Sequence, residues 1–205
     1  MKSSGNIPTL SVTAECLPEA WEKSVVAVWD YGVDIKTEYD KAGGAPSKDA
    51  TVMITVNNPF AEPRIHKNFP GGPVELEAYR QEVVEGIHDH WIDPVAGKWT
   101  YTYHERLFAY CPVEGLLDRK SPRPFAAVDQ IEYIIHSLAD VEHTRRAQAI
   151  TWMPTADIHT EDPPCLQRVW CRLAADETGR LMLNMNTHWR SRDLYKAWFM
   201  NVYAL

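Results

Sequence analysis

The sequence predicts an α+β domain whose main sheet is mixed or antiparallel. Two observations support this fold class: apolar residues recur at helical spacing in some segments and alternate, as in half-buried strands, in others. A chain of 205 residues, 45% of them hydrophobic and 24% charged, fits one domain with a substantial core. We therefore expect residues 1–205 to form a single domain.

In the first half of the chain, two helices are expected on either side of one strand. Pro18 opens the first helix, whose apolar stripe should face the core. The stripe consists of Trp21, Val25, Val28 and Trp29. A polar loop over residues 36–49 leads to Thr51–Val56, where apolar side chains alternate as in a strand. A Pro/Gly-rich loop over residues 58–73 precedes a second helix over about residues 74–88.

In the second half, three strands are expected between two helices. The first of these helices starts at Asp129, and its apolar stripe consists of Ile131, Ile134, Ile135 and Leu138. The strands are expected over residues 146–152, residues 166–173 and Leu181–Trp189. Asp193 is a suitable N-cap for the last helix. The buried side of that helix is expected to carry Leu194, Ala197, Trp198 and Leu205.

Charge and composition exclude several classes of function. A formal net charge of -7 argues against a general nucleic-acid binder, which needs a basic surface. The sequence contains neither an apolar run long enough to span a membrane nor a secretory signal, so we expect a cytoplasmic protein without membrane contacts. The cysteines are widely spread, without a CxxC pair, which predicts reduced thiols and neither a zinc site nor disulfides. They are Cys16, Cys111, Cys165 and Cys171.

Cys165 is the first candidate for chemistry. It follows Pro163-Pro164 and directly precedes an expected strand, so its backbone is stiff on one side and anchored on the other. Neighbouring guanidinium groups would lower the pKa of this thiol and favour the nucleophilic thiolate. Arg190 and the pair Arg145-Arg146 are the candidates for this effect. The alternative is that Cys165 is a small apolar core residue.

An anion site is the second candidate. Arg190-Ser191 lies where a strand meets a helix, so a guanidinium fork and free backbone N–H groups can hold a phosphate together. A solvated strand end, with an ion pair between an arginine and Asp193, is the alternative. Glu82 and Glu85 border an apolar helix face, which can raise a carboxyl pKa into the range of acid–base catalysis, although such residues commonly point to solvent.

Two polar segments in the middle of the chain are also candidates. GIHDHWID, residues 86–93, contains His and Asp residues, but their spacing matches no standard metal site and favours a polar helix end, so no metal is expected. YTYHERL, residues 101–107, alternates like a strand whose polar side chains either reach a cleft or lie on the surface.

Several motifs of the second half occur in a specific order. DQIEYIIHSL is followed by the arginine pair, ITWMP, DPPC ending at Cys165, RSRD from Arg190 to Asp193, and Asn201 eight residues later. In this order and spacing, residues 129–205 resemble the thymidylate synthase family, which includes pyrimidine nucleotide hydroxymethylases. In the first half, LPEAWEKSVVAVW, the Glu82 helix and YTYHERLF resemble the divergent, archaeal-type branch of that family.

This resemblance implies a mixed sheet flanked by helices and a homodimer that packs sheet to sheet. Cys165 resembles the nucleophile that adds to C6 of a pyrimidine nucleoside monophosphate, which makes C5 able to attack a folate-borne carbon. Arg190 resembles the arginine that contacts both the phosphate and the nucleophile's sulfur, and Ser191 resembles a phosphate donor. Arg145 and Arg146 resemble the pair that reaches the partner's phosphate.

Other positions match residues that bind the base, the folate and a catalytic water. Asp193 resembles the aspartate that contacts the folate's pterin ring, and the co-substrate implied is 5,10-methylenetetrahydrofolate. Asn201 resembles the asparagine that reads the N3 and O4 edge of the base, where members acting on cytosine commonly have aspartate. Glu82, with Glu85 as the alternative, resembles the glutamate that organises water and proton transfer.

The sequence departs from the family pattern at three places. Leu166 follows the nucleophile where many members have histidine. The family continues beyond the position of Leu205 with further helices and an HxY segment that binds the ribose, so this chain is expected to lack that C-terminal segment. The loop that carries a phosphate arginine in the family offers only lysines here, Lys36, Lys41 and Lys48.

The resemblance leaves more than one function open. The leading expectation is reductive methylation of dUMP to dTMP by a thymidylate synthase. The first alternative is a 5-hydroxymethylase acting on dUMP, dCMP or CMP, in which water captures the intermediate of the same cysteine adduct. The second is a non-catalytic nucleotide-binding protein or a truncated family member. The choice between ribose and deoxyribose is equally open.

Overall fold

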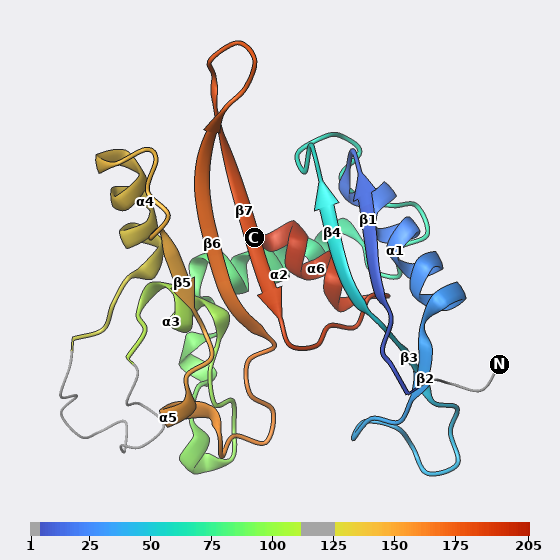
Figure 1. The fold of residues 1–205 in the computed structure, drawn as a ribbon. Coiled ribbons are helices and arrows are strands. Elements are labelled where there is room, and N and C mark those ends of the chain that lie inside the picture. The colour runs from blue at the N-terminus through green and yellow to red at the C-terminus, as the bar shows by residue number, and fades with distance from the viewer. Residues whose placement is uncertain (1–4, 112–125) are drawn as a thin grey trace. The chain divides into compact units, whose positions relative to one another are not determined.

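The computed structural model describes residues 5–111 and 126–205, and the chain folds into two compact units (Figure 1). Unit 1 consists of Met1–Glu77 and Asp193–Leu205, and unit 2 consists of Ala78–Arg192. Each unit contains both helices and strands, which confirms the predicted α+β class. That residues 1–205 behave as a single domain stays a prediction.

Unit 1 contains two small sheets. β1 (Thr9–Ala14) and β4 (Thr51–Val56) pair in parallel, with Val12 opposite Ile54. β2 (Val33–Ile35) and β3 (Ser47–Asp49) pair in antiparallel fashion. β4 is the strand predicted from alternation. The loop predicted over residues 36–49 ends earlier than expected, because residues 47–49 form β3.

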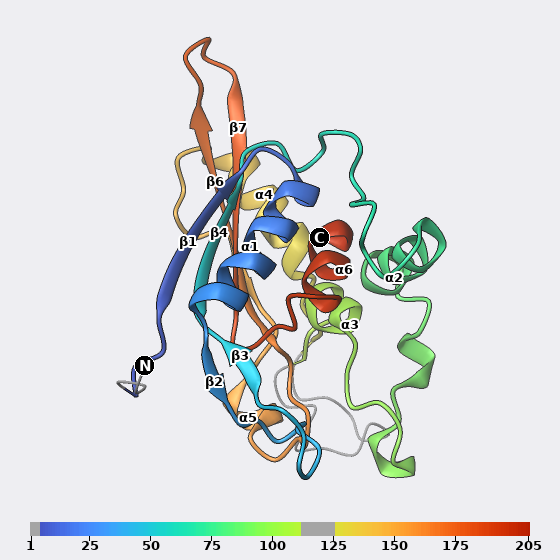
Figure 2. The same cartoon turned by 90° about the vertical axis from the view of Figure 1, so that its right-hand side faces the viewer.

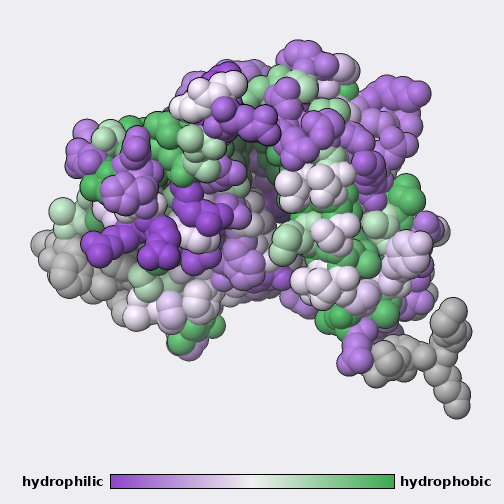
Figure 3. Space-filling view, turned by 45° about the horizontal axis from the view of Figure 1, so that its top comes forward, coloured by the Kyte–Doolittle hydropathy of each residue, from purple (hydrophilic) through white to green (hydrophobic). Residues whose placement is uncertain are grey.

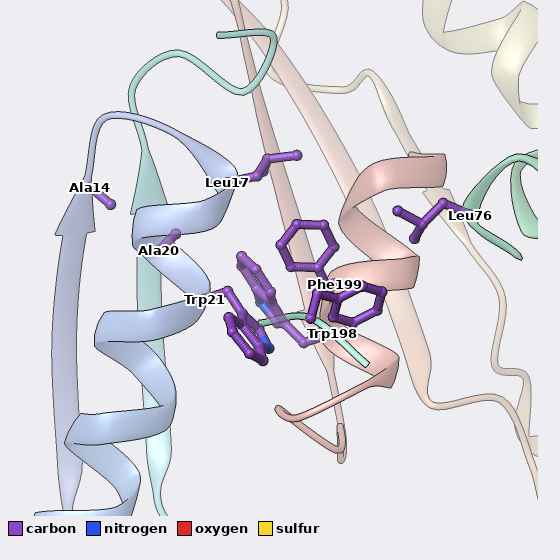
Figure 4. Close-up of a cluster of buried hydrophobic side chains, with 8 residues drawn as sticks. Ala14, Leu17, Ala20, Trp21, Leu76, Trp198 and Phe199 are labelled. Atoms are coloured by element: carbon purple, nitrogen blue, oxygen red, sulfur yellow. The ribbon is translucent and has the colours of Figure 1, made fainter. Parts of the chain in front are cut away.

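Helix α1 (Leu17–Tyr31) packs on β1 and β4 and against the C-terminal helix α6 (Ala197–Ala204) (Figure 2). Figure 4 shows the side chains of this core. They are Ala14, Leu17, Ala20, Trp21, Phe69, Leu76, Trp198 and Phe199. Trp29, predicted to belong to the core, is 72% exposed. The buried face of α1 runs through Trp21, Ser24 and Val28, and one further residue turns the helix by about 100°, toward solvent.

Helix α2 (Pro73–Glu85) ends three residues before the predicted end at residue 88. Gly86 stops it with a φ of 65°. A Cβ atom at this position would collide with the imidazole of His104, so only glycine fits. Two short 3-10 helices follow, η1 (Asp89–Trp91) and η2 (Pro94–Ala96).

The main sheet belongs to unit 2 and is antiparallel, in the order β5 (Gln148–Ile150), β6 (Leu166–Ala175) and β7 (Leu181–Trp189). The bounds of β7 are those predicted, whereas β5 is shorter than residues 146–152 and β6 is longer than residues 166–173. Within the described part of the chain the strands form three separate sheets, none of which mixes parallel and antiparallel pairs. The predicted mixed sheet is therefore not found, and the antiparallel alternative describes the main sheet.

Helices α3 (Tyr103–Phe108) and α4 (Gln130–Asp140) pack against this sheet. The prediction of a strand over YTYHERL is wrong, because Thr102 caps a helix there by accepting the N–H of Glu105 at 3.0 Å. Asp129 caps α4 as predicted, through the N–H of Glu132 at 2.8 Å. The core of the unit contains Leu107, Ile134, Ala147, Ala149, Leu166, Val169 and Cys171.

Three further expectations about burial and helix limits need correction. Ile135 of α4 is 60% exposed, because the sheet covers only the narrow side of the helix that centres on Ile134. The last helix begins at Ala197 instead of Asp193, whose carboxylate caps the preceding turn. Leu205 is not buried, since it follows the final helical turn; Phe199, which the stripe did not include, is fully buried.

The surface mixes hydrophilic and hydrophobic side chains, as Figure 3 shows for one face. In unit 1, Trp29, Phe60 and Val74 are exposed, and in unit 2 so are Leu183 and Met185 of β7. No helix in the described ranges has the length and apolar character needed to cross a membrane.

Candidate active site

Cys165 lies immediately before β6, and the end of β7 holds its backbone. The N–H of Arg190 donates to the Cys165 carbonyl at 2.9 Å. The Arg190 guanidinium donates through Nη2 to the Pro163 carbonyl at 2.7 Å and to Asp162 Oδ1 at 3.2 Å. Pro164 is fully buried. The nucleophile candidate and Arg190 are thus brought together, as predicted, and the thiol is half-buried.

The groups around the Cys165 thiol shift its pKa in opposite directions. Burial raises the pKa of Cys165, and the negative charge of Asp162 also raises it, whereas Arg190 and Arg192 lower it. Arg190 lowers the pKa of the thiol, as predicted, but the pKa is raised on balance because desolvation of the thiolate outweighs the two guanidinium groups. All four cysteines are free thiols.

Two tyrosines accompany Cys165. Tyr103 Oη accepts the N–H of Leu166 at 3.3 Å, and its ring centroid lies 5.7 Å from that of Tyr101, to which it is hydrogen-bonded. Burial raises the pKa of both phenols, so both are neutral at neutral pH. Of the polar residues in YTYHERL, these two interact electrostatically with Cys165, and Tyr103 does so from the first residue of α3.

The other polar residues of YTYHERL have structural partners. Arg106 is buried and pairs with Asp157, at 2.7 Å between Nη2 and Oδ1. His104 Nδ1 lies 2.7 Å from Asp89 Oδ2, and Asp89 Oδ1 accepts the hydroxyl of Thr102. Arg106 therefore neither reaches a cleft nor lies on the surface, the two alternatives predicted for this segment. It is buried within unit 2, where Asp157 balances its charge.

Arg192 is a candidate that sequence reasoning missed. Its guanidinium carbon lies 3.5 Å from the centroid of the Trp189 ring, and it interacts electrostatically with Cys165, Tyr103 and Tyr79. Burial lowers the pKa of Arg192 to about 9, so the group stays charged at neutral pH. The sequence did contain a sign of this role, because Arg192 is a cation within the RSRD motif. It lies between Ser191 and Asp193, to which the family resemblance assigns binding roles.

The two glutamates have separate partners. Glu82 Oε2 lies 3.0 Å from Nδ1 of His88, whose ring stacks on Trp91, and Glu85 pairs with Arg80 at 2.7 Å. This arrangement fits the polar helix end expected for residues 86–93. The choice of Glu82 over Glu85 as the proton-transfer residue stays a prediction.

The remaining predicted site residues fall into two groups: some are exposed residues of unit 2, and the others belong to unit 1. Arg145 and Arg146 are exposed, and their guanidinium groups bond to no other described residue, although their carbonyls accept from Trp170 and Tyr133. Ser191 is exposed. In unit 1, the side chain of Asp193 accepts three backbone N–H groups, and Asn201 of α6 is 7% exposed. The structure does not test their binding roles.

Comparisons with known proteins extend over nearly the whole chain. No protein-family model matches it. It is 27% identical to a protein of Methanococcoides burtonii and 26% identical to one of Methanosarcina acetivorans, each match covering 95% of this chain and 76% of the relative. Both relatives bear the name "Putative thymidylate synthase". Among solved structures, thermostable thymidylate synthase A from Bacillus subtilis has a similar fold, with a TM-score of 0.52, 14% identity, and coverage of 92% of this chain and 69% of that one.

Proposed function

Because the chain belongs to a divergent thymidylate-synthase-like family, we propose that it methylates dUMP reductively to dTMP. Membership in this family makes it a one-carbon transferase. The observation that carries the proposal is the thiol of Cys165, held before β6 by the backbone of Arg190 and flanked by the charges of Arg190 and Arg192. A nucleotide-binding module has no need of a thiol in this position.

In the proposed reaction, Cys165 acts as a covalent catalyst. Its thiol loses a proton as sulfur bonds to C6 of uracil, and the electron pair of the C5=C6 bond moves to C5. Methylenetetrahydrofolate, when bound, supplies the carbon and the hydride. After the new bond forms at C5, the C5 proton leaves and the bond between the transferred carbon and the folate nitrogen breaks. Addition of the hydride to that carbon then expels the Cys165 thiolate from C6, which leaves dTMP and dihydrofolate. Arg190 and Arg192 favour the thiolate during both steps, against the effect of burial.

The other residues are proposed to bind substrate and co-substrate. Arg190 and Ser191 hold the nucleotide's phosphate, which competes with Asp162 for the Arg190 guanidinium. Asn201 reads the base, and Glu82 supports proton transfer. The carboxylate of Asp193 offers about four lone-pair positions and uses three on backbone N–H groups, which leaves one for a pterin N–H.

The proposed active form is a homodimer in which Arg145 and Arg146 bind the partner's phosphate. Their exposure and lack of side-chain partners within the described residues support this role. In the test, inactive Arg146→Ala and Cys165→Ala chains are mixed, unfolded and refolded together. Each mixed dimer then has one intact site, and activity returns. No rescue in a mixture shown to contain mixed dimers contradicts a shared site.

The experiment for the reaction itself is an assay with methylenetetrahydrofolate and, separately, dUMP, dCMP, UMP and CMP. Methylation adds the mass of one CH2 group to dUMP and produces dihydrofolate. A product heavier by CH2O instead identifies the hydroxymethylase alternative. Binding of nucleotides without any product from the four substrates supports the non-catalytic alternative.

A further inference from the structure

Three buried N–H donors lie together near Cys165 without a partner. They are Nε and Nη2 of Arg192 and Nε1 of Trp189, none of which bonds to another described residue. The two side chains stack, with the guanidinium carbon 3.5 Å from the ring centroid. A buried donor without an acceptor costs about 1–3 kcal/mol, and more when it is charged. Three such donors in one stacked pair indicate a missing acceptor.

The geometry of the guanidinium specifies the kind of acceptor. Nε–H and one Nη2–H of arginine point in the same direction, so this edge binds two oxygens of a single oxyanion. The indole N–H adds a third donor and, like the guanidinium, accepts nothing. A neutral hydroxyl or amide would satisfy only part of this set.

Among the described residues of unit 2, no carboxylate pairs with Arg192. Tyr79 and Tyr103 are the phenols that interact with Arg192, and Tyr103 already accepts the N–H of Leu166. Asp162, the carboxylate beside Cys165, bonds to Arg190. The charge of Arg192 is therefore not neutralised by an ion pair among the described residues.

We propose that Trp189 and Arg192 form a buried oxyanion site beside Cys165, which takes a phosphate monoester or a carboxylate. Assigning the oxyanion to the nucleotide's phosphate rests on the proposed function, whereas the site itself rests on the unpaired donors. Arg192 then adds a binding group to those inferred from the family resemblance, which included Arg190 and Ser191 but not this residue.

The test measures binding by calorimetry on the full chain, with four probes. They are dUMP, deoxyuridine, inorganic phosphate and p-aminobenzoylglutamate, which carries the carboxylates of a folate tail. Arg192→Gln should weaken binding of dUMP and phosphate by about 10-fold or more and leave deoxyuridine unchanged. Arg192→Lys, which keeps the charge but loses the two-donor edge, and Trp189→Phe, which loses the N–H and part of the stacking ring, should lie between.

A second stacked pair in the same sheet gives a matched control. Arg172 lies over Trp170, 4.2 Å from the ring centroid, but it is exposed and the Trp170 N–H is bonded to the Arg145 carbonyl at 3.1 Å. Arg172→Gln should therefore bind all four probes like the wild type. The ligand-free Arg192→Gln chain should melt at the same temperature as the wild type or higher, because it lacks a buried, unpaired charge.

The outcomes separate this proposal from the proposed function. If Arg192→Gln binds every probe like the wild type, or loses deoxyuridine as strongly as dUMP, the oxyanion site is wrong, even in a chain that methylates dUMP. If only p-aminobenzoylglutamate is lost, the site stands and its assignment to phosphate is wrong. A chain that methylates nothing but loses phosphate binding on Arg192→Gln still supports the site.

Discussion

Two arginines of unit 2 contrast with each other: Arg106 is a buried residue, and Arg192 is partly buried with its Nε and Nη2 atoms out of solvent. Arg106, on α3, makes two hydrogen bonds to Asp157, at 2.7 and 3.3 Å, and also donates to Tyr110 and to the Thr151 carbonyl, which leaves only its Nε unpaired. Arg192, just after β7, stacks on Trp189 and has two unpaired nitrogens.

This difference distinguishes an arginine that stabilises the fold from one that is available to bind a ligand. A buried charge whose partner is present holds a fold in one arrangement, and removing either partner is strongly destabilising. A buried charge without a partner weakens the fold, so its presence near a nucleophile indicates a ligand that supplies the partner. We therefore expect the Arg106 region to control stability and the strand ends around Cys165 and Arg192 to control chemistry.

The largest effect is expected for Cys165→Ser. A hydroxyl is nearly the same size as a thiol but far harder to ionise, so turnover of dUMP should fall by at least about three orders of magnitude while nucleotide binding persists. Cys171→Ser, the same change at a position within β6, should leave turnover per folded molecule almost unchanged. Turnover by Cys165→Ser close to that of the wild type would remove the covalent mechanism.

The next effect concerns stability and belongs to the Arg106 region. Asp157→Ala leaves Arg106 buried without its carboxylate, so the free energy of unfolding in urea should fall by about 3–5 kcal/mol. Asp162→Ala removes an exposed carboxylate from Arg190, and solvent screens that pair, so the loss should be at most about 1 kcal/mol. Equal losses in the two variants would contradict the contrast between the regions.

A smaller effect is expected on base choice. Asn201 can accept from N3–H and donate to O4 of uracil, and Asn201→Asp supplies an acceptor for the 4-amino group of cytosine. The ratio of kcat/KM for dUMP to that for dCMP should therefore shift toward dCMP by about 1–3 kcal/mol. Asn184→Asp, the same change at an exposed position of β7, serves as the control. An unchanged ratio in Asn201→Asp would show that Asn201 does not contact the base.

The smallest effect is on the titration of the thiol. The pKa of Cys165 is raised by burial, so the alkylation rate of its peptide should reach half its maximum at a higher pH than that of a free thiol. Removing a cation raises the pKa further and removing an anion lowers it: Arg190→Gln should move the midpoint up, and Asp162→Asn should move it down. Shifts in the same direction would contradict the charge arrangement.

Local patterns predicted the elements that have strong periodicity or caps. Alternation predicted β4 and both ends of β7, and Asp129 predicted the start of α4. β1 was missed although its residues alternate, because only the parallel partner β4, far along the chain, makes it a strand. Tyr103–Phe108 forms a helix because of its Thr102 cap, which the alternating pattern concealed. Exposure of Trp29 depends on which face of α1 the sheet covers.

Only part of the candidate active site could be predicted from the sequence. The family motifs placed Cys165 and Arg190 together, and the structure joins them through one backbone hydrogen bond. The raised pKa of the thiol was not predictable, because it depends on burial produced by distant segments. Arg192 was missed for the same reason: unpaired donors become visible only when the surroundings of each nitrogen are known.

The central claim, that Cys165 bonds to C6 of the pyrimidine, can be measured directly with 5-fluoro-dUMP and methylenetetrahydrofolate. Hydrogen at C5 leaves as a proton, whereas fluorine cannot leave as a cation, so the reaction should stop with protein, nucleotide and folate covalently joined. Peptide mass spectrometry should find that adduct on Cys165 alone, and Cys165→Ser should form none. An adduct on another residue, or no adduct under conditions where 5-fluoro-dUMP binds, would contradict the account.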